Sequence, residues 1–301
     1  MKTLSTIARS FGIIAGLTAT LTGVGAARAQ AVPTLITMGC GYTITAPGSY
    51  ALAADIGPCS TSNGINVATS NVVLSLNGHT ITGSNNNNGT GINICVQNNE
   101  ICSPARLNNV NIQGPGQLRN FSNGIYLRNV DNSVIQNTVV AFNSLGLITN
   151  GATNLLLKAN VAVMNGGDGI HIENDTNDNV QGNIVVGDST VSTGDSGIAV
   201  VNGSGNEVSN NDINTNSCHG IWISSANNNI HQNSVFGNGN TNGQNCLGAG
   251  IIVWSGAAGN HIHNNTTGGN QIYDLVDVNP SCGSNTWKND TFSTTYQACD
   301  Q

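Results

Sequence analysis

Charged side chains are scarce in this chain, because Asp, Glu, Lys and Arg together make up only 8% of its 301 residues. The chain has 8 Lys and Arg against 15 Asp and Glu, and its formal net charge is −7. Such a balance disfavours binding to nucleic acid or to anionic membrane surfaces. Helical periodicity and long apolar runs are also missing beyond the N-terminus, which argues against a helical bundle and a membrane-spanning protein.

The first 29 residues resemble a signal peptide. Two basic residues, Lys2 and Arg9, flank a short apolar run, and an Ala-Arg-Ala cleavage site ends at residue 29. We therefore expect residues 30–301 to form one secreted or periplasmic domain. Removal of the three basic residues of the signal leaves 5 basic and 15 acidic residues, so the mature charge is 5 − 15 = −10.

The cysteine count fits an exported protein. Eight cysteines in an exported chain indicate disulfide bonds, although eight cysteines permit about 105 pairings. Pairing each cysteine with its nearest neighbour closes four local excursions of the chain. This pairing predicts the bonds Cys40–Cys59, Cys95–Cys102, Cys218–Cys246 and Cys282–Cys299.

A glycine followed by an apolar-x-apolar step recurs along the mature chain. Successive copies are separated by 22 to 33 residues, and variable insertions on a base period of about 22 residues are typical of a solenoid. The period of two within each phrase indicates a strand with one buried face. The glycines of this phrase are Gly64, Gly91, Gly124, Gly146, Gly169, Gly197, Gly220 and Gly250.

An asparagine column accompanies the glycines. It stands three positions after an apolar residue, and we interpret it as a ladder of side chains that satisfies backbone groups at a turn. A leucine-rich repeat also has such a ladder, but its leucine spacing does not match this Ile- and Val-rich, Gly-rich pattern. The members of the column are Asn137, Asn160, Asn183, Asn211, Asn233 and Asn265, with Asp290 last.

These patterns predict an all-β fold, a right-handed parallel β-helix of about nine coils. Disulfide-closed caps are expected at both ends, over residues 30–63 and 272–301, because a solenoid must cover its terminal apolar faces. The phrases "CGYTITAPGSYALAADI", "VVLSLNGHTITG" and "YDLVDVNPSCGSNTWKNDTF", together with the "GIxI" steps, resemble exported bacterial right-handed β-helix proteins of the pectate-lyase-like and NosD-like group. The resemblance covers nearly the whole mature chain and implies the fold more strongly than any one activity.

The strand parity identifies one outer face as the candidate site. In "GIHIEN" the isoleucines point inward, so His171 and Glu173 point outward. The same parity applied to every coil places Tyr126, Arg128, Trp222, Ser224 and Trp254 on this face. Asp168, Asp195 and His219 stand just before the strands, and insertions at 83–90, 187–195 and 237–249 should wall the face into a groove.

These residue types indicate carbohydrate chemistry. Trp222 and Trp254 offer flat apolar surfaces to sugar rings, with His219 and Ser224 as further binding residues. One hypothesis is hydrolysis, with the carboxylate pair drawn from Asp168, Glu173 and Asp195.

The other hypothesis is elimination or epimerisation of a uronate. In that reaction Arg128 binds the substrate carboxylate, His171 or Tyr126 removes the proton, and Glu173 orients His171. The paired-aspartate, calcium-cluster and Asp-Pro-His motifs of known β-helix enzymes are missing, so the sequence does not choose between the two reactions.

A second candidate site consists of histidines. His261 and His263 flank an inward Ile262, and His231 occupies the column of His263 one coil earlier. Imidazoles at this spacing suit copper or zinc. The cofactor expectation is therefore a divalent metal, Ca, Cu or Zn, or none.

The leading functional hypothesis is an exported protein that binds a polysaccharide and cleaves or modifies it as a lyase, epimerase or hydrolase. The alternatives are a non-catalytic glycan-binding or cell-envelope structural protein, and a periplasmic metal-binding protein. We expect a polysaccharide partner, no nucleic acid and no membrane span. The sequence leaves the oligomeric state open.

Overall fold

The structure is a computed structural model that describes residues 32–60, 62–84, 88–98, 101–189, 195–239 and 246–300. The chain divides into a short N-terminal unit, Met1–Val32, and a compact unit, Pro33–Gln301. The signal peptide expected at 1–29 lies outside the described residues, as do parts of the three expected groove insertions. No helix in the described part of the chain is long and apolar enough to cross a membrane.

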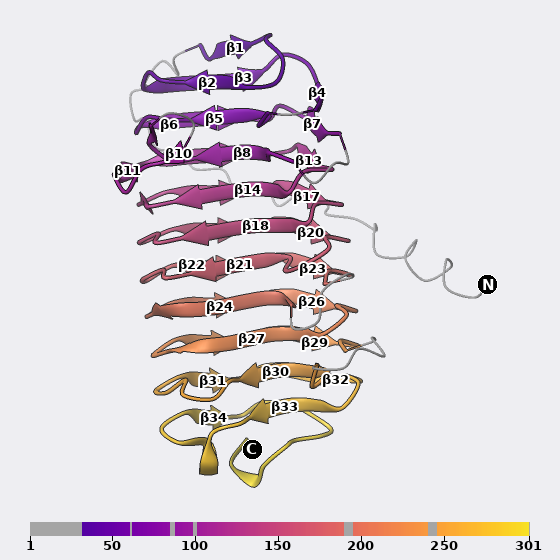
Figure 1. The fold of residues 1–301 in the computed structure, drawn as a ribbon. Helices are drawn as coiled ribbons and strands as arrows, with labels where there is room; N and C mark the ends of the chain where they lie inside the picture. Colours follow the sequence, from indigo (N-terminus) through magenta and orange to yellow (C-terminus); the bar gives the residue numbers. More distant parts are fainter. Residues whose placement is uncertain are drawn as a thin grey trace, which may run out of the picture. The chain divides into compact units, whose positions relative to one another are not determined.

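The compact unit is a parallel β-helix, whose coils are stacked from the indigo end to the yellow end of Figure 1. The strands form three long sheets, named A, B and C, and each coil contributes one strand to sheet B, then one to sheet A and then one to sheet C. All strand pairs within these three sheets are parallel. The prediction of an all-β solenoid with disulfides is confirmed.

Sheet A contains eleven strands: β1 (Thr34–Ile36), β3 (Gly48–Leu52), β6 (Val72–Ser75), β12 (Val110–Gln113), β16 (Val134–Gln136), β19 (Leu156–Lys158), β22 (Asn179–Gln181), β25 (Glu207–Ser209), β28 (Asn229–His231), β31 (His261–His263) and β34 (Thr286–Lys288). Sheet B contains ten strands: β2 (Tyr42–Ile44), β5 (Ile65–Val67), β8 (Thr90–Ile94), β14 (Asn123–Arg128), β18 (Leu145–Asn150), β21 (Ile170–Glu173), β24 (Ser196–Ser204), β27 (His219–Ala226), β30 (Ala249–Val253) and β33 (Tyr273–Asp277). Sheet C contains nine strands: β4 (Ile56–Cys59), β7 (Thr80–Gly83), β13 (Gln117–Arg119), β17 (Val139–Ala141), β20 (Val161–Val163), β23 (Ile184–Val186), β26 (Asp212–Asn214), β29 (Ser234–Phe236) and β32 (Thr266–Gly268). The described residues also contain the strand pairs β9 (Gln97–Asn98) with β10 (Ile101–Cys102) and β11 (Leu107–Asn108) with β15 (Val130–Asp131), and the 3₁₀ turns η2 (Pro280–Cys282) and η3 (Ala298–Asp300).

The core is a stack of inward aliphatic side chains, one column for each buried strand position. Their burial is the main favourable contribution to folding, at roughly 25 cal/mol for each Å² of apolar surface. One column of sheet B is fully buried from β5 to β33 and consists of Ile65, Ile92, Ile125, Leu147, Ile170, Ile198, Ile221, Ile251 and Leu275.

The recurring glycine is required by close packing at the corner before each sheet B strand. A Cβ atom added to Gly169 would lie 2.5 Å from Asp188 Oδ2 and 2.9 Å from the carbonyl oxygen of Gly197 in the next coil. Real Cβ atoms do not approach oxygen so closely, so any larger residue would displace the stacked backbone. This is the physical reason for the "GIxI" phrase.

Amide ladders line all three corners of the coil, whereas the sequence predicted one. At the corner between sheets A and C, Asn183 donates from its backbone N–H and from Nδ2 to Asn211 Oδ1, at 2.8 and 2.9 Å. It also donates to the carbonyl oxygen of Leu157 at 3.0 Å. The first ladder runs through Asn160, Asn183, Asn211, Asn233, Asn265 and Asp290; the second, between sheets C and B, through Asn143, Asn165, Asp188, Asn216, Asn238, Asn270 and Asp274; and the third, between sheets B and A, through Asp178, Asn206, Asn228, Asn260 and Asn285.

The prediction that Asn137 begins the first ladder is wrong. Thr138 holds that place, because its N–H and Oγ1 donate to Asn160 Oδ1 at 3.1 and 2.8 Å. Asn137 has φ 56° and corresponds to Ala159 one coil later. Members of the ladder stand three residues after an inward apolar residue. Asn137 stands three residues after Val134, which points outward, whereas Thr138 stands three residues after the inward Ile135.

Asn211 is a fully bonded rung of the first ladder, and its loss should destabilise the fold. Asn211→Ala should lower the free energy of unfolding by about 2 to 4 kcal/mol, since it leaves buried donors of Asn183 and the carbonyl oxygen of Val180 without partners. Urea unfolding would measure the loss. Asn214→Ala, whose amide is exposed and bonds only to Asp212 among described side chains, should change stability by less than about 0.5 kcal/mol.

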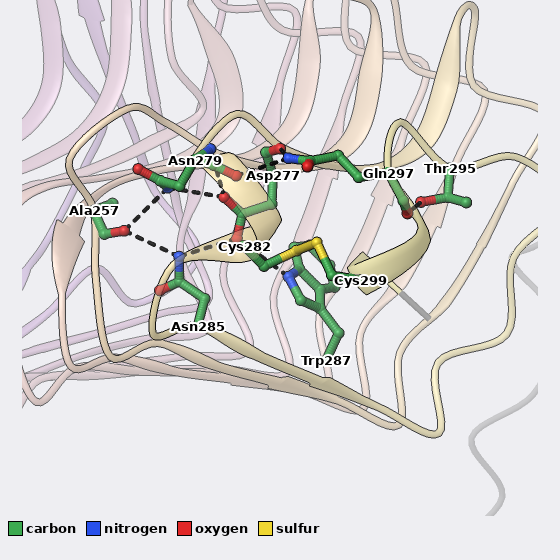
Figure 2. The surroundings of a disulfide bond; sticks show 9 residues. All are labelled: Ala257, Asp277, Asn279, Cys282, Asn285, Trp287, Thr295, Gln297 and Cys299. Atoms are coloured by element: carbon green, nitrogen blue, oxygen red, sulfur yellow. Dashed lines mark hydrogen bonds between the residues drawn. A yellow bond between two sulfur atoms is a disulfide. The ribbon is translucent and has the colours of Figure 1, made fainter.

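The C-terminal end of the helix is closed by a disulfide and a buried aspartate (Figure 2). Cys282 and Cys299 are bonded next to Trp287, which is only 7% exposed and covers the end of the core. Asp277 accepts hydrogen bonds from the N–H and Nδ2 of Asn279 at 2.9 and 2.8 Å and from Nδ2 of Asn285 at 3.0 Å. The carboxyl group of Asp277 therefore lies among hydrogen-bond donors at this end of the core.

Candidate functional site

The outer face of sheet B carries the predicted residues in register. Ile170 and Ile172 are buried, whereas His171 and Glu173 are partly exposed on the opposite side. Neighbouring strands pair the same residues that parity placed in columns. The first outward column is Asn66, Asn93, Tyr126, Ile148, His171, Ala199, Trp222 and Ile252, and the second includes Arg128, Asn150, Glu173, Val201 and Ser224.

Only the middle of this face is open. At the N-terminal end, the segment after Cys95 folds back through the Cys95–Cys102 disulfide, and Gln97 donates to Asn66 Oδ1 at 2.9 Å. Asn66 and Asn93 are consequently buried. The sequence analysis missed this cover, although the short spacing of the two cysteines was its signal.

At the C-terminal end, a second apolar cluster covers the face. Ala249, Ile252 and Val276 are fully buried there, and Leu247 and Tyr273 pack against them.

Between these covers, the second outward column stays partly exposed from Arg128 in β14 to Ser224 in β27, whereas Ile148 and Ala199 of the first column are buried. We call this part of the face the open stretch. At a rise of about 4.8 Å per coil, it offers room for roughly four sugar units.

His171 and Asp168 form a hydrogen-bonded pair at the centre of the open stretch. His171 Nδ1 lies 2.7 Å from Asp168 Oδ2, and the other oxygen of Asp168 accepts the backbone N–H of Ser196. Asp168 is 3% exposed, so the carboxylate is fixed while the imidazole edge reaches the surface. The pairing holds Nδ1 and leaves Nε2 without a partner among the described residues, as a general base requires.

The environment of His171 raises its pKa above the usual value. Burial opposes the charged imidazolium, but the hydrogen bond and the negative charge of Asp168, with a smaller contribution from Glu173, outweigh burial. A carboxylate that orients a histidine in this way also increases its basicity. Sequence reasoning had assigned the orienting role to Glu173, but the residue in contact with His171 is Asp168.

Glu173 and Arg128 lie on the second outward column, two coils or roughly 10 Å apart. Glu173 Oε2 accepts a hydrogen bond from Asn150 Nδ2 at 2.7 Å. No described residue forms a hydrogen bond or an ion pair with the Arg128 guanidinium. Arg128 can therefore bind an anionic group of a ligand through two N–H donors at once.

Tyr126 lies next to Arg128 and two coils before His171. Burial raises the pKa of its phenol, Arg128 acts in the opposite direction, and Glu173 adds to the rise. The phenol therefore stays protonated well above neutral pH. This suits a proton donor better than a base.

Two tryptophans lie near the C-terminal end of the open stretch. The rings of Trp222 and Trp254 are 6.4 Å apart and nearly perpendicular. Trp254 is 42% exposed, whereas Trp222 packs partly against the second apolar cluster. Trp254 is thus the more open platform for a sugar ring, and Ser224 stands beside it on the second column.

His219 does not face the open stretch. It is 4% exposed, burial lowers its pKa to about 4, and its Nδ1 accepts the backbone N–H of Ala249 at 3.3 Å. Cys218, His219 and Cys246 form the one group of possible metal ligands within 4.8 Å of one another in the described parts of the chain, but the two cysteines are joined as a disulfide.

The four disulfides join the same pairs as the nearest-neighbour prediction.

The histidines proposed as a metal site lie on sheet A. His231 and His263 stack with ring centroids 5.0 Å apart, and each ring bonds to a side chain of its own, Glu207 for His231 and Asn229 for His263. His261 occupies the other outward column and contacts Thr286. Stacked rings engaged in this way are arranged differently from ligands that converge on one ion.

Two further aspartates lie near Asp168. A Cβ atom on Gly167 would approach Asp195 Oδ2 to 3.0 Å, so Asp195 lies over the turn that holds Asp168. Asp188 is a fully buried ladder residue at the same corner, and burial raises its pKa to about 7. Its Oδ2 has no hydrogen-bond partner among the described residues. The sequence did not identify Asp188 as unusual, because an aspartate replaces an asparagine in its ladder.

Comparison with solved structures finds the same architecture in carbohydrate-active proteins. An alginate lyase from Paenibacillus sp. str. FPU-7 matches with a TM-score of 0.59 and 13% identity, over 86% of this chain and 98% of that one. A DFA-IIIase from Arthrobacter chlorophenolicus A6 in complex with GF2 matches with a TM-score of 0.58 and 15% identity, over 84% and 72%. The periplasmic alginate epimerase AlgG matches with a TM-score of 0.56 and 12% identity, over 83% and 70%.

At such low identity these structures establish the fold and no more. No curated protein shows significant sequence similarity to this chain. A family model described as "Right handed beta helix region" matches residues 94–267, more than half of the chain. On that match, and on the three parallel sheets, the chain belongs to the right-handed β-helix family.

Proposed function

We propose that this protein binds a polysaccharide along the open face of sheet B and acts on it by proton transfer, as a lyase or an epimerase. The observation that carries the proposal is the Asp168–His171 pair at 2.7 Å, which leaves Nε2 as a base at the surface. Arg128 and Tyr126, the other groups that this chemistry needs, lie on the same face. The carbohydrate-active proteins of the same fold are consistent with the proposal.

Each residue has a defined task in the proposed reaction. Arg128 neutralises a carboxylate of the sugar, which acidifies the neighbouring C–H bond, and His171 Nε2 accepts that proton. In elimination, the electron pair forms a C=C bond while the adjacent C–O bond breaks, and the Tyr126 hydroxyl gives its proton to the departing oxygen. In epimerisation no C–O bond breaks, and Tyr126 returns a proton to the opposite face of the carbon.

Hydrolysis is less well supported by the geometry. A glycoside hydrolase of the usual kind needs two carboxyl groups that flank the scissile bond. Asp168 is buried against His171 and Ser196, and Glu173 is engaged by Asn150. The described residues of the open face therefore supply a histidine base more readily than a carboxylate pair.

A panel of polysaccharides separates the alternatives. Elimination gives an unsaturated product, so ultraviolet absorbance and reducing ends should rise together. Epimerisation in D₂O should incorporate deuterium at carbon without chain cleavage. Reducing ends without absorbance would contradict the mechanism, and retained affinity without any product would assign the protein as a glycan-binding module.

The pH dependence of kcat/KM is a further expected outcome. His171 must be neutral to accept a proton, and its pKa is raised above 6.5, so kcat/KM should increase with pH and level off only above that value. Asp168→Asn removes the largest cause of the raised pKa of His171. The increase of kcat/KM with pH should therefore occur at lower pH in this variant. An increase that stays in place in the variant would show that another group controls it.

The location that we propose is secreted or periplasmic. Four disulfides are typical of proteins in an oxidising compartment, and the N-terminal 29 residues have the pattern of a signal peptide. Fractionation of cells that express the full chain, with the cleaved N-terminus determined by mass spectrometry, tests both points.

A further inference from the structure

Among the described residues, Arg128 is the one arginine or lysine available on the open face. Arg128 stands on it beside Tyr126, and the acidic side chain of Glu173 lies two coils away. The other basic residues of the compact unit lie elsewhere. Arg119 is on sheet C, Lys158 and Lys288 are on sheet A, and Arg106 is paired with Asp131.

The positive charge of Arg106 is balanced by a neighbouring carboxylate. Its guanidinium pairs with the Asp131 carboxylate through two nitrogens, and it also donates to the carbonyl oxygen of Gly151 at 2.8 Å and to Thr153 at 3.1 Å. Such a bidentate pair offsets the charge of Arg106, so that it attracts an anionic substrate less than an unpaired arginine does. The electrostatic attraction for an anionic ligand is therefore concentrated at Arg128.

The spacing of the coils determines how many sugar units lie over the open face with its one available arginine. An extended sugar chain that follows the helix axis advances one unit for about every coil, at roughly 4.8 Å. A homopolymer of uronates would then bring about four carboxylates onto an open face with one arginine. At least one of them would lie close to Glu173 without a cation between, and like charges at such a distance repel.

The end of the face beyond His171 is apolar. Towards the C-terminus the accessible outward positions are Val201, Trp222 and the exposed Trp254, with Ser224 as the polar exception. Tryptophan rings bind the C–H faces of sugars and offer no compensation for a carboxylate. These positions suit uncharged sugar units.

Resting on the proposed function, we infer that the substrate is a heteropolysaccharide in which a single uronate is flanked by neutral sugars. The uronate occupies the position between Arg128 and His171, and its neutral neighbours extend towards Trp254. Homopolyuronates such as alginate and polygalacturonate fit this face poorly, because their adjoining carboxylates meet Glu173 and the apolar end.

The test compares two groups of polymers on the mature protein. Heteropolysaccharides with one uronate per repeat, including gellan and hyaluronan, are set against alginate, polygalacturonate and polyglucuronate, with affinity and product formation measured for each. We expect at least one heteropolysaccharide to exceed every homopolyuronate about tenfold in kcat/KM. A homopolyuronate that equals or exceeds them overturns the inference but leaves the proposed function standing, and neither binding nor turnover with any polymer overturns both.

A gain-of-function variant gives a second readout. Ser224→Arg adds a cation two coils beyond Glu173 and should raise the affinity for the homopolyuronates at least about fivefold. Asn214→Arg adds the same charge on sheet C and serves as the matched control. Equal gains in both variants would show that net charge, and not the local arrangement of the open face, limits homopolyuronate binding, which would overturn the inference.

Discussion

His171→Gln is expected to lower kcat by a factor of about 10² to 10⁴ while leaving the fold intact, because it removes the base of the proposed reaction. The side chain is partly exposed on the outer face of sheet B, so its loss creates no cavity in the core. Affinity for the substrate should change little, because the main binding contacts are assigned to Arg128 and Trp254. Kinetics with an active polysaccharide and a thermal unfolding curve of the same preparation check both halves of the prediction.

Asp168→Asn tests whether the buried partner positions the base. The amide retains the shape but loses the charge that holds the imidazole and supports its protonated form. We expect kcat to fall by about ten- to a thousandfold, with KM nearly unchanged and the pH profile shifted. Glu173→Gln is the control, since it contacts Asn150 rather than His171 and contributes less to the pKa of His171, so it should shift the pH profile less than Asp168→Asn does. A shift in the Glu173 variant as large as that in Asp168→Asn would contradict the assignment of Asp168.

The buried carboxyl group of Asp188 makes the stability of the protein depend on pH. Asp188 occupies a ladder position where Asn165 donates to its Oδ1 at 2.7 and 2.8 Å, while its Oδ2 has no partner in the part of the chain that the structure describes. The neighbouring rung Asn216 uses the corresponding Nδ2 to reach Asn238 Oδ1 and the carbonyl oxygen of Val185. A neutral carboxyl can donate as an amide does, whereas an ionised one presents a bare oxygen to acceptors.

The sign of this effect follows from the raised pKa. Burial raises the pKa of folded Asp188 to about 7 from 3.8, so the folded state keeps a proton that the unfolded chain releases above pH 3.8. The stabilising contribution is complete below 3.8, declines as pH rises, and is lost once pH passes about 7. Asp175 and Asp178, whose pKa values burial also raises, act in the same direction.

Asp188→Asn should therefore stabilise the protein at pH 8.5 by about 2 to 4 kcal/mol, since each unit of pKa shift corresponds to about 1.4 kcal/mol. Near pH 4 the variant and the parent protein should unfold at nearly the same urea concentration. Asp212→Asn, at an exposed position of sheet C, is the control and should show no such difference. An unchanged pH dependence in Asp188→Asn would refute the account of the second ladder.

The parts of the fold that sequence predicted are those that repeat with a fixed residue offset. The glycine phrase gave the coils, because a glycine such as Gly169 has no room for a Cβ atom, and strand parity placed His171 outside the core. The sequence analysis followed one asparagine column only, and the other two ladders, which include Asp178 and Asp188, were not predicted.

The candidate site was predictable only as a set of outward residues. Parity fixes the side of the sheet, but the Asp168–His171 contact crosses the end of the strand, where a period of two no longer applies. The covers at both ends of the face depend on insertions whose path has no periodicity. Burial of His219 under Ala249 is one result of such a cover.

The most direct test of the central claim is a crystal structure of the His171→Gln variant with an oligosaccharide from an active polymer. The account predicts a sugar chain along the open face of sheet B, with a carboxylate on Arg128, the reacting carbon beside residue 171 and the next sugar against Trp254. An oligosaccharide bound on sheet A or sheet C, with the Arg128 face unoccupied, would contradict it.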